Sequence, residues 1–262
     1  MLVTVARLSA GYGGADVIKD IEFEVRSGES LAVLGTNGCG KSTLLKAMGR
    51  LIGYRGTVSI DSRDITGFSR RDLAKNIALL GQNTPVCFPY TVRETVSLGR
   101  YAYGRGLLPR LSREDERRIA ETMDRLDLTD IKDRMIDELS GGQIQRVFLA
   151  KTIVQDPGLI LLDEPANHLD LKNRIEILGY LKQWVGETGK TLVGVYHDLT
   201  LVHHFADRAL LMKSGRLAAW GSVRTVLTRE TLQEVYGIDV FGFMRASLSF
   251  FQPQPPQPPA VS

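Results

Sequence analysis

One glycine-rich segment has residue types at a spacing that could bind phosphate. Residues 35–43 read Gly-Thr-Asn-Gly-Cys-Gly-Lys-Ser-Thr and fit the pattern G-x-x-x-x-G-K-[ST] of a phosphate-binding loop. Glycines let the backbone curl so that several N–H groups face one phosphate, and a following helix adds the positive end of its dipole. We expect Lys41 to reach the β- and γ-phosphates of a nucleotide and Ser42 to ligate Mg²⁺. The loop residues expected at the nucleotide are Gly35, Asn37, Gly38, Cys39, Gly40, Lys41, Ser42 and Thr43.

Two carboxylates follow a short apolar segment at residues 159–162. Asp163 and Glu164 would lie at the carboxyl end of a strand, where ligands bind in open α/β sheets. Asp163 suits Mg²⁺, through water, because a hard cation prefers carboxylate oxygen. Glu164 could orient or deprotonate an attacking water. Two acids that simply end a strand are common, so this hypothesis depends on their pairing with the phosphate loop.

Histidine and cysteine side chains give weaker signals. His197 follows a third apolar segment, residues 191–196, where a contact with the γ-phosphate is favoured over a purely structural role. His203 and His204 do not share one side of a helix with His197, so we predict no metal site there. Cys39 could be a site of thiol modification, but a small residue filling a small space is the favoured interpretation.

Hydrophobic periodicity indicates the elements that must position these side chains. Residues 2–6 and 21–25 alternate as strands around a glycine-rich turn, and short apolar strands are expected at 31–34, 159–162 and 191–196. A helix should follow the phosphate loop at 41–48. Short apolar strands separated by helices favour an α/β fold with a mostly parallel sheet covered on both faces.

The middle of the chain reads as helical. Ser112 and Asp115 have the spacing of a capping box, and Ile119, Met123 and Leu126 follow at helical spacing. A further helix should begin near residue 142 and carry residues 147, 148 and 150 inward. We therefore expect a helical subdomain at about 85–154, inserted in the α/β core. Residues 252–262 hold five of the ten prolines and should form an extended, poorly ordered tail.

Composition narrows the class of protein. The 33 Lys+Arg and 30 Asp+Glu leave a net charge of +3, too small to indicate a nucleic-acid partner, and none is expected. Hydrophobic residues make up 43% and charged residues 24%, as in globular proteins. No apolar run reaches the roughly 18 residues of a spanning helix, and no signal peptide is expected. Cys39 and Cys87 are the two cysteines, so we expect no disulfide framework and a soluble, cytosolic protein.

A second motif of small residues allows the sequence to be compared with a known protein family. Leu139-Ser140-Gly141-Gly142-Gln143 precedes the two acids by about twenty residues and would place small groups at a helix start, a second anion site. Together with the phosphate loop, it closely resembles the signature of ATP-binding cassette (ABC) ATPases. The resemblance covers residues 1 to about 240, leaving 241–262 as a C-terminal extension. It implies a P-loop NTPase (RecA-like) core with an N-terminal antiparallel β subdomain and an inserted α-helical signature subdomain.

The resemblance also implies roles for residues that spacing alone does not single out. Tyr12 matches the aromatic that stacks on adenine, and Gln82 matches the glutamine that joins the catalytic Mg²⁺ and water to the helical subdomain. Asp170 matches the loop that crosses to the opposite subunit, and His197 matches the switch histidine. In this family two copies close head-to-tail on two ATP molecules. The signature residues expected at the opposite ATP are Ser140, Gly141, Gly142 and Gln143.

Two stretches look like a subgroup of this family. Residues 91–101 and 230–238 are similar to the ATPases of importers of iron–siderophore complexes, haem and cobalamin, and molybdate importers share much of this. The resemblance implies ATP hydrolysis coupled to uptake through a membrane permease, on the cytoplasmic face of the membrane, with a substrate-binding protein acting indirectly. The cargo, and homodimer versus a pair with another ATPase, stay open. Ala166 and Ile144 depart from the usual pattern without touching a reacting group.

The motifs also leave other classes of ATP-binding protein open. A non-transport cassette ATPase, of the iron–sulfur cluster assembly type, is the main alternative, and a nucleotide kinase is disfavoured because it would need an acceptor site.

Residues 100–118 hold six arginines and three acids, a surplus equal to the net charge of the whole chain. These arginines could contact acidic permease loops or lipid head groups, or they could simply form a solvated helix face.

Overall fold

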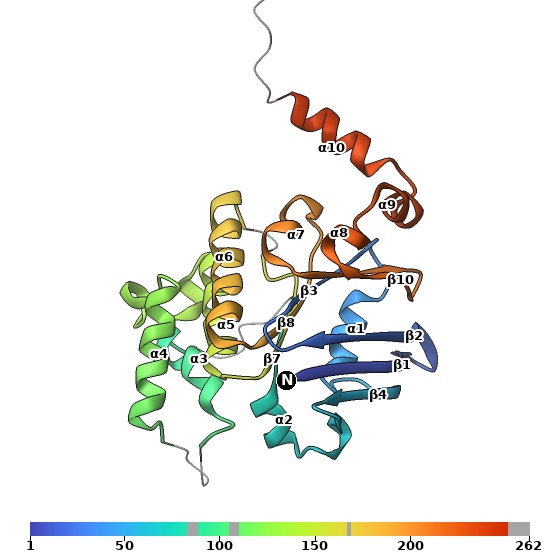
Figure 1. Cartoon of the computed structure of the whole chain (residues 1–262). Helices are drawn as coiled ribbons and strands as arrows, with labels where there is room; N and C mark the ends of the chain where they lie inside the picture. The colour runs from blue at the N-terminus through green and yellow to red at the C-terminus, as the bar shows by residue number, and fades with distance from the viewer. Residues whose placement is uncertain (83–88, 105–109, 167–168, 251–262) are drawn as a thin grey trace, which may run out of the picture.

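The computed structural model describes residues 1–82, 89–104, 110–166 and 169–250 (Figure 1). Cys87, Arg105 and the proline-rich tail expected at 252–262 lie outside the described residues. The chain folds around two sheets, as the sequence predicts, and within the described residues no helix is both long and apolar enough to cross a membrane.

The larger sheet has six strands in the order β10-β9-β3-β8-β7-β6. Strands β9, β3, β8, β7 and β6 run parallel, and β10 is an antiparallel edge. Their bounds are β3 Ser30–Gly35, β6 Ile77–Leu80, β7 Leu159–Asp163, β8 Thr191–Val195, β9 Arg208–Lys213 and β10 Arg216–Ser222. The mostly parallel α/β sheet predicted from the apolar runs is confirmed.

Both faces of this sheet are buried, because alternate side chains of each strand enter different cores. On β3, Leu31 and Val33 belong to one core, shared with α1 (Lys41–Met48), whereas Ala32 and Leu34 belong to the other. The second core is closed by α5 (Gly141–Val154) and α6 (Leu171–Thr188), whose buried residues include Phe148. Burial of both faces explains why these strands read as continuous apolar runs.

The smaller sheet is antiparallel, in the order β2-β1-β4-β5. Strands β1 (Leu2–Tyr12) and β2 (Ala15–Arg26) form a hairpin, with β4 (Tyr54–Ile60) and β5 (Arg63–Asp64) on the other side of β1. Both hairpin strands are longer than the predicted 2–6 and 21–25. The pairing shifts register between Val5 and Leu8, and Arg7 has a φ of 48°. This bulge interrupts the alternation of side chains, which is why the pattern did not show the rest of the strand.

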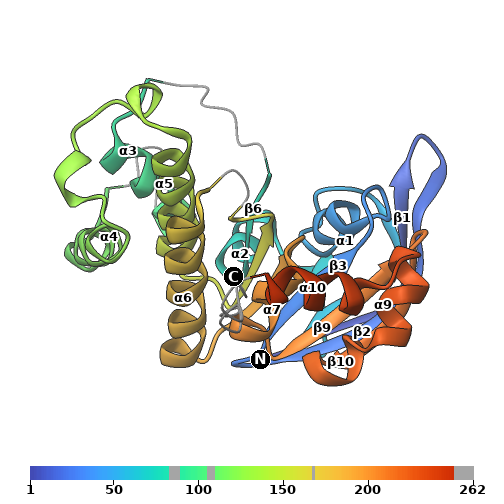
Figure 2. The same ribbon diagram turned by 90° about the horizontal axis from the view of Figure 1, so that it is seen from above.

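Helices α3 (Val92–Ser97), α4 (Arg113–Arg125) and α5 lie together on the side of the molecule away from the hairpin (Figures 1 and 2). The predicted capping box of Ser112 and Asp115 starts α4, and α5 carries Val147, Phe148 and Ala150 inward. Both predictions are confirmed. The remaining helices are α2 Arg70–Asn76, α7 Leu199–Phe205, α8 Val223–Val226, α9 Arg229–Tyr236 and α10 Val240–Ser249.

Half of the arginines in the 100–118 cluster are neutralised inside the chain. Arg100 is 7% exposed and bonds Asp115 at 2.6 Å, so it is a buried ion pair rather than part of a free surface. Arg117 pairs with Glu114 and Glu121, and Arg118 pairs with Glu114 and Asp156. For Arg117 and Arg118, which are 60% and 39% exposed, these pairs favour the interpretation of a solvated helix face, whereas Arg100 is buried and belongs to neither interpretation.

Candidate nucleotide-binding site

The phosphate loop joins the end of β3 to the start of α1. Gly35, Gly38 and Gly40 all have positive φ, from 74° to 143°. A Cβ at Gly40 would lie 2.5 Å from Ile18 Cγ2, so this turn needs glycine for space as well as for its φ of 102°. Lys41, 6% exposed, donates hydrogen bonds to the carbonyl oxygens of Gly35 and Thr36 at 3.0 and 2.9 Å. Its ammonium group is therefore already held over the loop.

Cys39 is buried and is not among the residues that line the cavity beside the loop. Its side chain is 3% exposed, and a Cβ built at Gly35 would lie 2.8 Å from Cys39 Sγ. Burial raises the pKa of the Cys39 thiol, against the lowering effect of Lys41. This arrangement supports the interpretation of Cys39 as a small residue that fills a small space.

Asp163 ends β7 directly beside the start of α1. Ser42 Oγ donates a hydrogen bond to Asp163 Oδ1 at 3.0 Å, and Asp163 is 4% exposed. Burial raises the pKa of Asp163 and Glu164 adds to this, while the bond from Ser42 and the charges of Lys46 and Lys41 oppose it. A buried carboxylate and a hydroxyl in contact are hard oxygen ligands, so these residues fit Mg²⁺.

Glu164 connects the ends of three strands. Gln82 Nε2, just beyond β6, donates to Glu164 Oε2 at 2.5 Å, and His197 Nε2, just beyond β8, contacts Glu164 Oε1. Glu164 itself has a φ of 57°, an uncommon backbone conformation for a residue other than glycine. Such conformations cost free energy and cluster at functional sites. No pattern in the sequence indicates this backbone conformation.

A cavity of about 610 Å³ brings most of the predicted residues together. Glu164, His197 and Gln82 form one wall, and Tyr12, 50% exposed at the tip of the hairpin, borders the opening. The other residues that line it are Val17, Asn37, Gly38, Gly40, Lys41, Ser42 and Thr43. Five of the residues predicted at the site, Tyr12, Lys41, Gln82, Glu164 and His197, are remote in sequence and meet at this one cavity.

The signature segment does not line this cavity. Ser140 is the N-cap of α5, and its hydroxyl accepts from the backbone N–H of Gln143, whose side chain accepts from Ser140 N at 3.0 Å. This capping box leaves Gly141 and Gly142 in the first turn of the helix. Asp170 is the exposed N-cap of α6 and is likewise absent from the cavity lining. Within one chain these residues and the phosphate loop are separate.

Two residues of α5 make contacts with distant segments that were not predicted. Gln145 Nε2 donates to the carbonyl oxygen of Pro165 at 2.8 Å, and Arg146 pairs with Asp127 and Glu176, each at 2.8 Å. Arg146 also bonds Asn173 near the start of α6. The polar pair Gln145-Arg146, directly before the apolar run 147–150 of the same helix, is the sequence signal that could have indicated these contacts.

Tyr196, at the end of β8, is expected to tolerate loss of its hydroxyl. The group is buried, has no hydrogen-bond partner among the described residues, and has its pKa raised by burial. Because an unpaired buried hydroxyl is destabilising, Tyr196→Phe should increase the free energy of unfolding by roughly 1 kcal/mol. Urea denaturation of both proteins measures this. A less stable variant would show that the hydroxyl is paired in solution.

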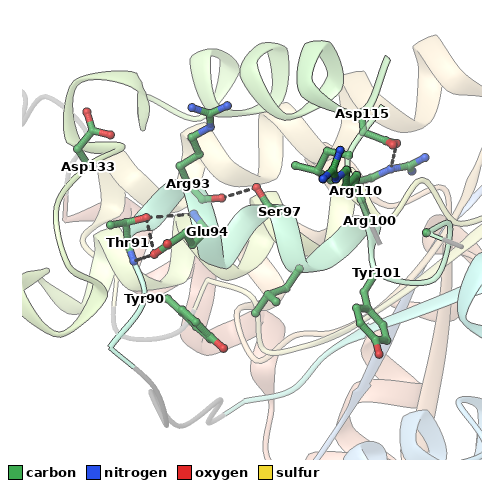
Figure 3. A pocket seen from close by; sticks show the side chains of 13 residues that line it. Tyr90, Thr91, Arg93, Glu94, Ser97, Arg100, Tyr101, Arg110, Asp115 and Asp133 are labelled. Atoms are coloured by element: carbon green, nitrogen blue, oxygen red, sulfur yellow. Dashed lines mark hydrogen bonds and ion pairs between the residues drawn. The ribbon is translucent and has the colours of Figure 1, made fainter. Parts of the chain in front are cut away.

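A second hollow, of about 630 Å³, lies along α3 (Figure 3). We call it the α3 groove. Four large side chains in its lining are exposed, namely Tyr90, Leu98, Tyr101 and Leu111, and Tyr101 is 71% exposed. In Figure 3, Tyr90 and Tyr101 extend in one direction while Arg93 points the opposite way. The groove therefore offers an aromatic surface next to charged side chains.

A phosphate loop between β3 and α1, with two acids at the end of β7, which is separated from β3 by β8 in the same parallel sheet, defines the class of P-loop NTPases. The model of the ABC transporter family matches residues 18–167. The chain belongs to the ABC transporter family, and its fold is that of the family's ATPase domain.

Several curated relatives align along almost their whole length. The petrobactin import ATP-binding protein YclP of Bacillus subtilis is 37% identical over 240 residues, which are 91% of this chain and 94% of that protein. The ferric enterobactin transport ATP-binding protein FepC of Escherichia coli is 35% identical, covering 88% and 86%. The hemin import ATP-binding protein HmuV of Bradyrhizobium diazoefficiens is 35% identical, covering 97% and 95%.

Solved structures agree with this assignment. An ABC transporter of metal-chelate type, in an inward-facing conformation, matches with a TM-score of 0.78 and 28% identity over 90% of this chain and 89% of that one. A bacterial ABC transporter cassette solved as a dimer matches with a TM-score of 0.74 and 29% identity over 85% and 99%. The two-sheet arrangement is thus shared with known ABC ATPases.

Proposed function

We propose that this protein is the ATP-hydrolysing subunit of an importer for an iron–siderophore complex, haem or a related chelate such as cobalamin. The observation that carries the proposal is the single cavity at which Lys41, Gln82, Glu164 and His197 meet. The relatives support this class of cargo, since they are ATP-binding proteins of petrobactin, enterobactin and hemin importers. Residues 1–240 would form the ATPase domain, with the helical subdomain at about 85–154.

Each part of the cavity has a task in phosphoryl transfer. The loop N–H groups and the start of α1 bind the β-phosphate, and Lys41 exchanges its bonds to Gly35 and Thr36 for phosphate oxygens. Ser42 and Asp163 would hold Mg²⁺, which neutralises phosphate charge when bound. Tyr12, exposed beside the loop, stacks on the adenine ring.

Glu164 is positioned to handle the attacking water. Its carboxylate lies between Gln82 and His197, so its two oxygens have separate partners. Glu164 orients the water and accepts its proton, and His197 stabilises the charge that develops on the γ-phosphate. Gln82 connects the same carboxylate to the segment that leads into the helical subdomain.

A second copy completes the site. Ser140, Gly141 and Gly142 lie at the exposed start of α5, and Asp170 lies at the exposed start of α6. Since neither reaches its own phosphate loop, these groups are available to the ATP bound by the opposite subunit. The dimeric cassette among the similar structures supports this arrangement. Two copies would then share two ATP molecules.

The α3 groove is the proposed contact with the permease, at the cytoplasmic face of the membrane. We expect Tyr101→Ala to weaken binding of the permease about tenfold, because exposed aromatic residues in a groove are typical interface anchors. The ATPase activity of the free protein should be unchanged. Co-purification and titration with the detergent-solubilised permease measure the effect. Phe243→Ala, an equally exposed aromatic on α10, is the control, and equal binding by both variants would contradict this location.

Reconstitution tests the proposed function as a whole. The protein and its permease in liposomes, with the binding protein loaded with ferric siderophore, haem or cobalamin, should show ATPase activity that one of these cargoes stimulates. Stimulation by molybdate alone would assign another cargo. Co-purification with soluble cluster-assembly scaffolds, and with no permease, would contradict the transport role.

A further inference from the structure

Arg174 forms hydrogen bonds with two segments, one that leads into α6 and one that follows His197. It lies in the first turns of α6, and its Nη1 donates to Asp198 Oδ2 at 3.1 Å while its Nη2 donates to the carbonyl oxygen of Leu169 at 3.3 Å. Leu169 directly precedes Asp170, and Asp198 directly follows His197. One guanidinium therefore connects the exposed start of α6 to the segment that carries His197.

The same side chain borders a cavity next to Glu164. This cavity, of about 20 Å³, is lined by Glu164, His197, Arg174, Asp198 and Tyr196 among others. The Nε atom of Arg174 is buried and has no partner among the described residues. The guanidinium of Arg174 borders the same small cavity as Glu164 and His197. A movement of Leu169 or Asp198 would therefore shift a planar group that lies beside both of these side chains.

We propose that Arg174 is a positioning residue for ATP hydrolysis. It holds the segment before Asp170 against the segment after His197, so that contact of Asp170 with a second copy of this chain sets the position of His197 relative to Glu164. The inference rests on the proposed ATPase function and on the dimer, and it adds Arg174 as the residue through which the opposite subunit would act on the site.

The ion pair itself contributes little to folding. The side chains of Arg174 and Asp198 are 29% and 36% exposed, and ion pairs of this exposure are weak in water. A large loss of rate on breaking the pair would therefore reflect altered geometry and not unfolding. Misplacement of a reacting group by about 1 Å can reduce the rate of an enzyme by roughly two orders of magnitude.

The variants Arg174→Ala and Asp198→Asn test the connection. Asparagine at 198 keeps the oxygen that accepts from Thr200 N and caps α7, so it removes the charge without removing the cap. We expect each variant to lower kcat for ATP about tenfold, with KM for ATP and the melting temperature nearly unchanged. Arg174→Lys, which keeps one of the two contacts, should recover part of the rate.

A double variant and a matched control complete the experiment. If Arg174 and Asp198 act as a unit, the double variant should be no slower than either single one, whereas independent effects would multiply to about a hundredfold loss. Lys182→Ala is the control, because Lys182 also connects α6 to α7, through the carbonyl oxygen of His204 at 2.6 Å, but neither residue lines the nucleotide cavity or the small cavity beside Glu164. It should keep the parent rate.

Three results would overturn the inference: an Arg174→Ala rate within twofold of the parent, multiplicative losses in the double variant, or an equal loss in Lys182→Ala. The ATPase activity of the parent protein tests the proposed function separately, since the inference depends on the ratios between variants.

Discussion

Glu164→Gln should lose nearly all ATP turnover while ATP binding persists. The substitution keeps the size of the side chain and an oxygen for the bond from Gln82, but it removes the group that accepts the proton of water. A positioned general base contributes roughly 10²- to 10⁴-fold to the rate, so we expect kcat to fall at least a hundredfold. Phosphate release measures turnover, and equilibrium binding of a fluorescent ATP analogue measures affinity.

The surface substitution Glu121→Gln is a suitable control for this experiment. Glu121 is an exposed partner of Arg117 on α4 and lies outside the cavity, so its variant should match the parent in both assays. If Glu164→Gln instead kept a rate within tenfold of the parent, Glu164 would not be the base. Loss of ATP binding in the same variant would show that Glu164 contributes to nucleotide affinity and not to the chemical step.

The backbone of Glu164 adds a reason to expect this sensitivity. With a φ of 57°, the residue directs its carboxylate toward Gln82 and His197 from a conformation that is costly for glutamate. Parallel strands end at one edge of the sheet, and β6, β7 and β8 are neighbours, so the three side chains meet there. The order of the strands in the sheet brings these three side chains together, and the sequence of a single strand does not determine that order.

Local patterns predicted most of the elements of the fold. The apolar runs of β3, β7 and β8, the helix at 41–48 and the capping box at Ser112 and Asp115 all depend on neighbouring residues, and the structure contains each of them. The hairpin was predicted too short because the bulge near Arg7 breaks the alternation. A bulge depends on the partner strand, which periodicity along one strand does not report.

The residues of the candidate site also differ in how well the sequence predicts them, depending on whether they belong to a local motif or are placed by distant contacts. Lys41, Ser42, Asp163 and Glu164 could be predicted from motifs because each motif fits one strand and its loop. Tyr12 and Gln82 became candidates only through resemblance to a family, since their positions depend on contacts between distant segments. The contacts of Gln145, Arg146 and Arg174 were missed for the same reason, because each joins a helix to a loop far away in the sequence.

Charge is the property that sequence described least well. The surplus in residues 100–118 was compatible with an interaction surface or with a solvated helix face, yet Arg100 is directed inward to Asp115 and to the carbonyl oxygen of Val154, at 2.9 Å. Its guanidinium also lies 3.7 Å from the centre of the Tyr103 ring. A sum of charges takes no account of burial, so it counted a structural ion pair as part of an interaction surface.

Arg100→Ala is therefore expected to destabilise the helices that carry the signature. Removing one partner of a buried pair leaves the other charge uncompensated, which costs about 3 kcal/mol of the free energy of unfolding. Urea denaturation of the parent and the variant measures the loss. Arg117→Ala, whose ion pairs are exposed, is the control and should leave the midpoint almost unchanged. Equal midpoints for both variants would contradict the structural role of Arg100.

The same pair predicts a dependence on pH. Burial would raise the pKa of Asp115, but hydrogen bonds from Ser112 and Arg100 overcome this and lower it. A carboxyl whose pKa is lowered by folding contributes stability above its unfolded value, about 3.9, and loses that contribution as the pH falls through the folded value. The penalty of Arg100→Ala should thus be complete at pH 7 and shrink in strong acid. A penalty that is constant down to the folded pKa of Asp115 and below it would show that Arg100 acts through packing on Tyr103 and not through charge.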